Sequence, residues 1–278
     1  MTLRIATTRP LPEPDPDEPL LLEALAARAV DARMVWWRDA DEPWEAPGKI
    51  VVRSTWDYPR HAQAFIAWIE RAQRSGGLMN PGPVLRGNVH KRYLLELAAR
   101  GISTVPTLLV TASDAKRTVR AMASEQRFEG VVIKPAISAG SFMTKRFDDV
   151  SAPEADAHLR EVLSGGDALV QPVMREVERS GERALVFIDG QLTHAVRKEP
   201  RLAGGEERVH VADIADDERA LALAALAPIA SSLLYGRVDM VRDGEGRPCI
   251  MELELLEPSL FLMQHPPALA RLADALAR

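Results

Sequence analysis

The sequence predicts a mixed α/β protein with more than one domain. Short apolar runs typical of β-strands alternate along the chain with segments in which apolar residues recur at helical spacing. The length of 278 residues exceeds what a single hydrophobic core usually serves, so two or more domains are expected. The composition, 46% hydrophobic and 27% charged, excludes a mainly disordered chain.

Charge and cysteine content narrow the class of protein further. The 35 basic and 40 acidic residues leave a net charge of -5, and no block of Lys and Arg with interleaved aromatic residues is present, which argues against nucleic-acid binding. The single cysteine, Cys249, excludes an internal disulfide framework and a thiolate zinc site. Residues 1–15 contain no apolar segment typical of a signal peptide, and no stretch approaches the ~20 apolar residues that span a bilayer. We therefore expect a cytoplasmic protein that binds small molecules, with no nucleic-acid partner and no membrane partner.

The first 87 residues are expected to form a small α/β domain. Strands are expected at residues 3–6, 34–37 and 50–52, and helices at residues 20–28 and 61–74. The segment Arg53-Ser54-Thr55-Trp56-Asp57-Tyr58 follows the third strand, at the carboxyl end where open α/β sheets bind ligands. Gly76-Gly77 should end the second helix, and the Pro- and Gly-rich stretch of residues 80–87 is expected to be a linker that ends the domain.

The remaining chain is expected to mix helices with antiparallel strands. Helices are expected at residues 88–100, 113–124, 154–163, 216–234 and 266–278. Strands are expected at residues 107–110, 131–134, 168–171, 183–188, 192–196, 235–241 and 249–255. Asp189-Gly190 is a strong signal for a two-residue hairpin turn, and Pro228 should kink or restart the helix that contains it.

Acidic residues near the C-terminus form the most informative pattern. If residues 235–241 and 249–255 pair as a hairpin, Asp239 lies on one strand while Glu252 and Glu254 share one face of the other. Three converging carboxylates repel one another unless a cation is bound, and Mg²⁺ prefers such an all-oxygen site. The alternative is an exposed strand pair with its polar face in water.

Two lysines and a loop of small residues indicate an anion site. Lys134 ends an apolar strand, where its charge cannot be buried without a partner. The loop that follows contains Ser138, Gly140 and Ser141, which would let backbone N–H groups approach phosphate oxygens closely. Lys91 begins its predicted helix. Viewed alone, either lysine is more typical of a solvated surface.

Two further segments carry polar groups at strand ends. Pro172 breaks a predicted strand, where exposed backbone groups suit a purine edge and the carboxylates of Glu178 and Glu182 suit ribose hydroxyls. Positive charge gathers further along the chain, at Arg197, Lys198 and Arg208. Such cations neutralise a transferring phosphoryl group or simply coat a surface, and a solvated loop is the alternative for the acids.

The order of these features resembles the ATP-grasp superfamily over almost the whole chain. Two lysines, a small-residue loop, a strand break with acids, a group of cations and a final Asp with Glu-x-Glu follow one another as they do in that family. The resemblance is closest to the subgroup of O-ureido-D-serine cyclo-ligases of cycloserine biosynthesis, and the glutathione synthetases are more distant relatives. The subgroup resemblance rests on residues 53–58, 194–200 and 251–260.

The resemblance implies an ATP-grasp fold in which ATP lies between two antiparallel sheets. The implied parts are an N-terminal α/β domain on the substrate side, residues 1–87, a central subdomain with a lid loop, residues 88–166, and a C-terminal subdomain with the metal site, residues 167–278. Residues that match the nucleotide site are Lys91 and Lys134 on the phosphates, Ser138, Gly140 and Ser141 in the lid, Gln171, Pro172 and Val173 at the adenine hinge, and Glu178 and Glu182 near the ribose. Residues that match the metal ligands and the catalytic cations are Asp239, Glu252 and Glu254, and Arg197, Lys198 and Arg208.

One departure from the wider superfamily lies in the metal site. Most members have Glu-x-Asn where this chain has Glu252-Leu253-Glu254. The extra negative charge favours Mg²⁺ more strongly or leaves Glu254 partly unused.

Substrate recognition is expected at the end of the third strand and in the last loop, on Arg53, Ser54, Thr55, Trp56, Asp57, Tyr58, Glu257 and Ser259. Arg53 suits a substrate carboxylate and Asp57 an ammonium group, which together describe an amino acid. Packing between domains is the alternative role for Trp56 and Tyr58.

The activity implied by the resemblance is an ATP- and Mg²⁺-dependent ligase of antibiotic biosynthesis, acting on an amino acid or amino-acid derivative. With ATP and one or two Mg²⁺ ions, such enzymes convert a carboxylate into an acyl phosphate, from which an amine of the same or another molecule displaces phosphate. The expected partners are small-molecule carboxylate and amine substrates, and the resemblance suggests a homo-oligomer. The alternatives are a small-molecule kinase with the same nucleotide site and a non-catalytic nucleotide-binding protein.

Overall fold

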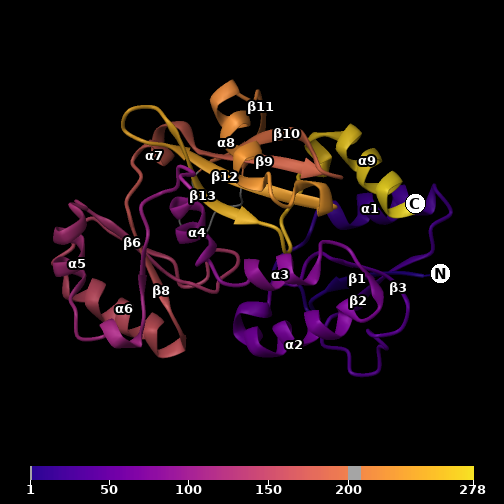
Figure 1. Ribbon diagram of the computed structural model, residues 1–278, viewed down its shortest axis with the longest axis horizontal. Coiled ribbons are helices and arrows are strands. Elements are labelled where there is room, and N and C mark those ends of the chain that lie inside the picture. Colours follow the sequence, from indigo (N-terminus) through magenta and orange to yellow (C-terminus); the bar gives the residue numbers. More distant parts are fainter. Residues whose placement is uncertain (1, 200–207) are drawn as a thin grey trace.

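The computed structural model describes residues 2–199 and 208–278, which form three β-sheets with helices packed around them. Figure 1 shows one sheet with α2 and α3 on one side of the view, a second sheet with α5 and α6 on the other side, and the largest sheet above both. This arrangement confirms the predicted mixed α/β class. Pro200, the last residue of the segment 194–200 on which the subgroup resemblance partly rests, lies outside the described residues.

The N-terminal sheet is parallel, with the strand order β2-β1-β3-β4. Its strands are β1 Leu3–Thr7, β2 Ala32–Trp36, β3 Gly48–Val52 and β4 Gly76–Leu78. Its helices are α1 Asp17–Ala26, the 3₁₀ turn Tyr58–His61, α2 Ala62–Gln73 and α3 Gly82–Asn88. The largest side chains of its core are aromatic and buried: Trp37, Trp44, Phe65 and Trp68.

The structure corrects two expectations for this part of the chain. Residues 80–87 are not a linker, because Gly82–Asn88 form α3 and Leu85 is fully buried in the aromatic core. A proline in the first turn of this helix is tolerated since that N–H has no intrahelical partner. Gly77 does not merely end a helix: it belongs to β4, where a Cβ would lie 2.3 Å from the carbonyl oxygen of Gly48.

The central sheet is antiparallel, with the strand order β5-β8-β6-β7. Its strands are β5 Leu108–Val110, β6 Val131–Pro135, β7 Lys145–Phe147 and β8 Ala168–Pro172, and the helices packed on it are α5 Val119–Gln126 and α6 Pro153–Gly165. Helix α4 Tyr93–Ala99 precedes β5 in the chain but packs against the C-terminal sheet. The predicted helix at 88–100 is therefore shorter at its start. The predicted helix at 113–124 is divided into the 3₁₀ turn Ala112–Asp114 and α5, because the Thr118 hydroxyl accepts a hydrogen bond from Ala121 N at 3.2 Å and caps a new start.

The C-terminal sheet is antiparallel and has the strand order β11-β10-β9-β12-β13. Its strands are β9 Glu182–Ile188, β10 Gln191–Lys198, β11 Val209–Ala212, β12 Tyr235–Arg242 and β13 Pro248–Glu254, and its helices are α7 Glu176–Ser180, α8 Asp216–Leu226 and α9 Pro266–Ala277. The hairpin at Asp189-Gly190 is confirmed, with φ values of 52° and 71°. The predicted helix at 216–234 ends at Leu226, before Pro228, which has no N–H to continue it.

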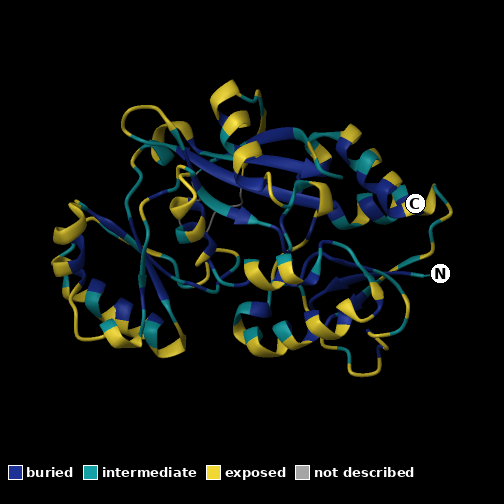
Figure 2. Cartoon of the chain, in the orientation of Figure 1, coloured by how far each residue is buried: buried dark blue, intermediate teal, exposed yellow. Residues whose placement is uncertain are grey.

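The domain boundaries remain a proposal. Strand β8 lies within residues 167–278 but pairs with β5 and β6 of the central sheet. Figure 2 shows the inner strands β9 and β12 of the C-terminal sheet buried over most of their length, with exposed residues concentrated on the helices and loops around the sheet. Among the described residues, no helix has the length and apolar character needed to cross a membrane.

Buried polar side chains fix the N-terminal domain against the β12–β13 hairpin. The Asn80 amide donates to the carbonyls of Tyr235 at 2.9 Å and Leu255 at 2.8 Å, and its oxygen accepts from Leu234 N at 2.8 Å. The Tyr235 hydroxyl donates to the Leu256 carbonyl at 2.9 Å and to the carbonyl of Val52 on β3. These groups are buried, so breaking any of these hydrogen bonds would leave a polar group unsatisfied. The bonds therefore hold the carboxyl end of β3 against the loop after β13.

The buried imidazole of His194 should make stability depend on pH. It stacks on His265 with centroids 4.7 Å apart and donates to the Leu260 carbonyl at 3.1 Å. Burial, then the charge of His265, lowers the pKa of His194 from 6.5 to about 4. The unfolded chain therefore binds an extra proton between these values, and stability is lost as pH falls from 6.5 towards 4, by up to about 3 kcal/mol.

Urea unfolding at pH 7 and pH 4 measures this loss. We expect His194→Gln to lose less stability than the wild type over this interval, because the titrating group is gone. His210→Gln, at an exposed position, should lose as much as the wild type. Equal losses in all three proteins would contradict the assignment.

Candidate active site

A cleft of about 1070 Å³ opens where the three sheets meet. Its walls come from the loop after β6, the ends of β8 and β10, the β12–β13 hairpin and the loops after β3 and β13. The volume is at the upper end of the usual range for small-molecule sites, which suits a nucleotide together with a second substrate. The predicted site residues that line it are Trp56, Asp57, Tyr58, Lys91, Lys134, Ser138, Gly140, Ser141, Gln171, Pro172, Val173, Glu178, Glu182, Lys198, Asp239, Glu252, Glu254, Glu257 and Ser259.

Two buried lysines converge on one carboxylate in this cleft. Lys134 Nζ lies 2.6 Å from Glu252 Oε1, and Lys91 Nζ lies 3.4 Å from Glu252 Oε2. Burial alone would raise the pKa of Glu252, but the two ammonium groups lower it to about 2. Two positive charges facing one negative charge leave an excess that an anion such as a phosphate would satisfy. Lys134 faces the cleft because side chains alternate along β6, and Ile133 packs into the core on the other side.

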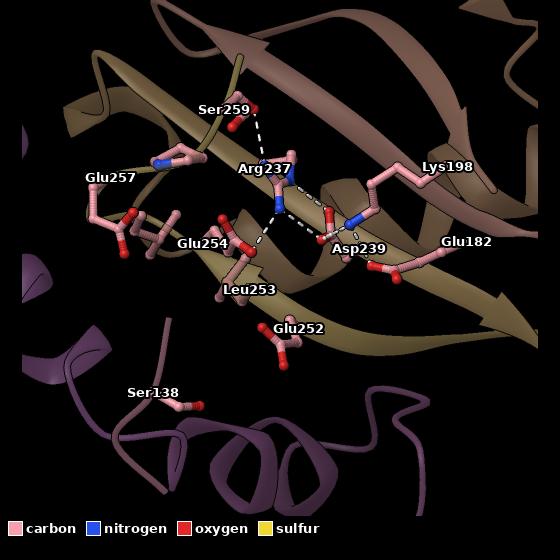
Figure 3. A network of polar contacts seen from close by, with 12 residues as sticks. Ser138, Glu182, Lys198, Arg237, Asp239, Glu252, Leu253, Glu254, Glu257 and Ser259 are labelled. Carbon is pink, nitrogen blue, oxygen red and sulfur yellow. Dashed lines mark hydrogen bonds and ion pairs between the residues drawn. The ribbon is translucent and has the colours of Figure 1, made fainter. Parts of the chain in front are cut away.

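A second ion-pair network lies beside Glu252 (Figure 3). Asp239 is the cross-strand partner of Glu252 and accepts hydrogen bonds from Lys198 Nζ and Arg237 Nε, both at 2.7 Å. Lys198 also lies 2.5 Å from Glu182. Burial works against the charge of Asp239, but Arg237 and Lys198 hold its pKa below the usual range. Burial raises the pKa of Glu182 to about 7; Lys198 opposes this rise, and Asp239 adds to it.

Arg237 is a functional candidate that sequence reasoning missed. Its buried guanidinium donates to Glu254 at 2.6 Å and to the Ser259 carbonyl at 2.9 Å, besides its bonds to Asp239. It also lies 5.4 Å from the ring centroid of Phe261. A sequence signal exists, because Arg237 precedes Asp239 by two positions and the two side chains must project from the same face of β12.

The carboxylates of this region suit magnesium. Asp239 and Glu252 face one another across the hairpin and offer oxygen atoms, and Mg²⁺ is usually held by one or two carboxylates together with phosphates and water. In this structure each of them is bonded to a lysine or arginine, and Glu254 is bonded to Arg237. Within the described parts of the chain, no three His, Cys, Asp or Glu side chains are arranged to hold a metal ion. The facing pair of Asp239 and Glu252 could therefore contribute to a metal site only if phosphates and water supplied the other ligands.

The predicted lid is the loop between β6 and β7, and it contacts the N-terminal domain. The carbonyl of Ser138 accepts hydrogen bonds from Lys91 Nζ at 2.9 Å and from the Tyr58 hydroxyl at 3.3 Å. Phe142 of the same loop lies 5.5 Å from the guanidinium carbon of Arg60. The loop therefore covers the lysines from the side of the N-terminal domain.

The predicted adenine hinge lies at the end of β8. Gln171 is buried and donates to the Thr107 hydroxyl at 2.9 Å, and Val173 N donates to the Gly130 carbonyl at 3.0 Å. The expectation of free backbone groups is therefore wrong for Val173 N. Glu178, the residue predicted for the ribose, lines the cleft and accepts a hydrogen bond from Arg146.

Three predicted substrate residues do not line the cleft. Arg53 is buried, lies 3.7 Å from Asp17 and donates to the Pro258 carbonyl at 2.9 Å. This corrects the expectation that Arg53 binds a substrate carboxylate, because its guanidinium holds the protein's own loops together. Ser54 and Thr55 are also fully buried, and the Ser54 hydroxyl donates to Asp15.

The predicted catalytic cations separate into two groups. Lys198 lines the cleft, whereas Arg197 and Arg208 do not. Arg197 lies 3.8 Å from Glu199, and Arg208 is exposed. Neighbouring residues of β10 point to opposite faces of the sheet, so Lys198 and Arg197 cannot both face the same site.

The backbone of the loop that carries Glu257 and Ser259 is fixed by side-chain hydrogen bonds at three consecutive residues. The carbonyls of Glu257, Pro258 and Ser259 accept hydrogen bonds from Trp56 Nε1 at 3.4 Å, Arg53 Nη1 at 2.9 Å and Arg237 Nη1 at 2.9 Å. Burial, followed by repulsion from Glu254, raises the pKa of Glu257 well above its ordinary value. A positively charged ligand beside Glu257 would offset both effects and favour its charged form.

Comparison with known proteins finds relatives over nearly the whole chain. Residues 3–80 match the family described as D-cycloserine synthetase DcsG, N-terminal domain. The chain is 35% identical to the cycloserine biosynthesis protein DcsG of Streptomyces lavendulae over 280 residues, which cover 95% of this chain and 93% of that protein.

Solved structures agree with this result. The crystal structure of D-cycloserine synthetase DcsG superposes with a TM-score of 0.90 and 33% identity, over 100% of this chain and 99% of that one. The D-alanine–D-alanine ligase from Bacillus anthracis, in complex with ATP, superposes with a TM-score of 0.66 and 14% identity, over 99% and 96% of the two chains. The second likeness is one of fold alone.

Proposed function

The chain belongs to the ATP-grasp ligases that include D-cycloserine synthetase and is an ATP-dependent ligase, and we propose that it activates the carboxylate of an amino-acid derivative as an acyl phosphate and closes a ring on it. The observation that carries the proposal is the convergence of Lys91, Lys134, Glu252 and Asp239 in a single cleft. The ring-closing reaction is suggested by similarity to D-cycloserine synthetase over nearly the whole length of both chains.

Activation needs positive charge around the transferring phosphoryl group. In the proposed reaction, an oxygen of the substrate carboxylate attacks the γ-phosphorus, the bond to ADP breaks, and ADP leaves. In this proposal Lys91 and Lys134 hold phosphate oxygens. Arg237 and Lys198, which donate to Asp239 beside Glu252, balance the negative charge of the substrate carboxylate. These groups are already oriented by their ion pairs, so little reorganisation is needed when substrates bind.

Metal binding is proposed for Asp239 and Glu252, with Glu254 as a third ligand if Arg237 releases it. A bound Mg²⁺ would supply charge neutralisation at the phosphate oxygens. The adjacent lysines would then transfer from Glu252 to the phosphates.

Ring closure requires that water be excluded from the acyl phosphate. A nitrogen of the same molecule attacks the carbonyl carbon, loses a proton and displaces phosphate. The loop from Ser138 to Phe142, held by Lys91 and Tyr58, is suited to cover this step because it closes the cleft towards the N-terminal domain.

ADP release with O-ureido-D-serine, with and without hydroxylamine, tests the proposal. We expect ADP to form only in the presence of the amino acid, and hydroxylamine to trap the activated carboxylate as a hydroxamate. A kinase that phosphorylates a hydroxyl group would release ADP without a hydroxamate. A protein that only binds nucleotide would release no ADP, and either result would contradict the proposal.

A further inference from the structure

One carboxylate in the cleft differs from those around it. The surrounding acidic side chains are held by donors of the protein itself: Asp57, Glu178, Glu182, Glu199, Asp239, Glu252 and Glu254. Over residues 2–199 and 208–278, the side chain of Glu257 has neither a hydrogen bond nor an ion pair. Figure 3 shows its carboxylate set apart from the connected chain of Arg237, Asp239, Lys198 and Glu182.

The backbone under this carboxylate is rigidly positioned. Three consecutive carbonyls, those of residues 257–259, are each held by the N–H of a different side chain: Trp56, Arg53 and Arg237. The next residue, Leu260, donates its N–H to Asp17 at 2.8 Å, and its carbonyl accepts from His194. A loop held at so many points presents Glu257 in a fixed place, which lowers the entropy cost of binding a ligand there.

The chemistry of this position selects a cation with N–H donors. Burial, followed by repulsion from Glu254, raises the pKa of Glu257, and a bound cation would offset both effects whereas a phosphate or carboxylate would add to them. A metal ion at Glu257 itself is less suited, because Mg²⁺ needs several oxygen ligands and the carboxylates proposed to supply them are Asp239, Glu252 and Glu254. Ser259 lines the same cleft, and a serine hydroxyl can accept a hydrogen bond. A primary ammonium group, with three donors, matches a carboxylate and a hydroxyl.

The other acid considered for this role is already engaged. Asp57 accepts a hydrogen bond from Trp37 Nε1 at 2.6 Å and lies 4.0 Å from Arg38. An ammonium group would therefore have to compete with partners that Glu257 does not have.

We propose that Glu257, assisted by Ser259, binds the α-ammonium group of the amino acid that this ligase activates, with the reacting carboxylate turned towards Arg237. This inference rests on the proposed function, and it makes Glu257 the residue that restricts the enzyme to substrates with a free amino group. Arg237 connects the proposed metal site to the loop that carries Glu257, since it donates both to Glu254 and to the carbonyl of Ser259.

The test compares O-ureido-D-serine with the analogue that has hydrogen in place of the amino group. Binding is measured by calorimetry in the presence of a non-hydrolysable ATP analogue and Mg²⁺, and ADP release is measured separately with ATP. We expect Glu257→Gln to weaken binding of the amino compound about 100-fold, as for loss of a charged hydrogen bond, and to leave binding of the analogue within about 3-fold. In kinetics the loss should fall on KM more than on kcat.

Glu245→Gln is the matched control, since Glu245 lies in the exposed turn after β12 and should change neither affinity. An unchanged affinity of Glu257→Gln for ATP and an unchanged unfolding midpoint show that the variant is folded. The inference is overturned if Glu257→Gln weakens both compounds equally, or if it raises the Mg²⁺ concentration required while the preference for the amino compound persists. A preference that depends on Glu257 supports it even if no ADP is released, in which case only the proposed function fails.

Discussion

Replacing Glu252 by Gln is expected to slow ADP release by roughly 1000-fold while the protein remains folded. Glu252 is the carboxylate on which Lys91 and Lys134 converge, and it faces Asp239 across the hairpin. The amide keeps a hydrogen-bond acceptor for Lys134 but leaves two buried ammonium groups without their counter-charge, so the loss of stability should be about 3 kcal/mol. The substitution does remove the negative charge that would hold a cation beside the phosphates. Steady-state ADP release at saturating ATP and Mg²⁺ measures the effect.

Nucleotide affinity separates this explanation from a general loss of the site. In EDTA, Glu252→Gln should bind ATP at least as tightly as the wild type, because the two lysines no longer share their charge with a carboxylate. With Mg²⁺ present, the wild type should gain affinity and the variant should gain little. Turnover close to that of the wild type, or an equal gain from Mg²⁺ in both proteins, would contradict the metal assignment.

The strands of the site could be predicted because their signals are local. The apolar runs that became β6, β9, β10, β12 and β13 are visible without knowledge of their partners, and Asp189-Gly190 specifies its turn by its own backbone preferences. The positions of Lys134, Asp239 and Glu252 follow from alternation along those strands.

Other elements depend on partners that are distant in the sequence. Helix α3 is rich in Pro and Gly, and it is stable because Leu85 is buried among aromatic residues of the N-terminal core. The short strands β4, β7 and β11 have too few residues for a periodic pattern and are defined by the strands beside them. Local propensity cannot identify such segments, because tertiary contacts determine their conformation.

The division of charged residues into structural and functional ones could not be predicted either. Arg53 lies directly after β3 as predicted, but the acids that pair with it, Asp15 in the preceding loop and Asp17 at the start of α1, come from a segment whose path is not encoded locally. Alternation requires that Lys198 and Arg197 face opposite sides of the sheet, yet only the structure shows which side holds the cleft.

Replacing Arg237 by Met is expected to destabilise the protein by about 3–5 kcal/mol. The guanidinium is buried and is shared by Asp239 and Glu254. Without it Glu254 would lose its ion-pair partner, and Lys198 alone would balance Asp239 and Glu182. Uncompensated charge in a buried region is costly, whereas methionine fills much of the space. ADP release should also fall, since Arg237 lines the cleft. Urea unfolding in EDTA measures the loss of stability.

Magnesium should restore part of this stability, which a purely structural role for Arg237 does not predict. The two carboxylates that lose the guanidinium are proposed metal ligands, so a divalent cation can take its place. The unfolding midpoint of Arg237→Met should therefore rise in roughly 10 mM Mg²⁺, a concentration high enough to exceed the dissociation constant of a weak site and give measurable stabilisation. Arg242→Met is the matched control on the same strand. Arg242 binds Asp217 at the half-exposed end of β12, so its loss should cost about 1 kcal/mol and be insensitive to Mg²⁺. If the midpoint of Arg237→Met in Mg²⁺ equals its midpoint in EDTA, Asp239 and Glu254 do not share a cation, and the metal site must be placed on Asp239 and Glu252 alone.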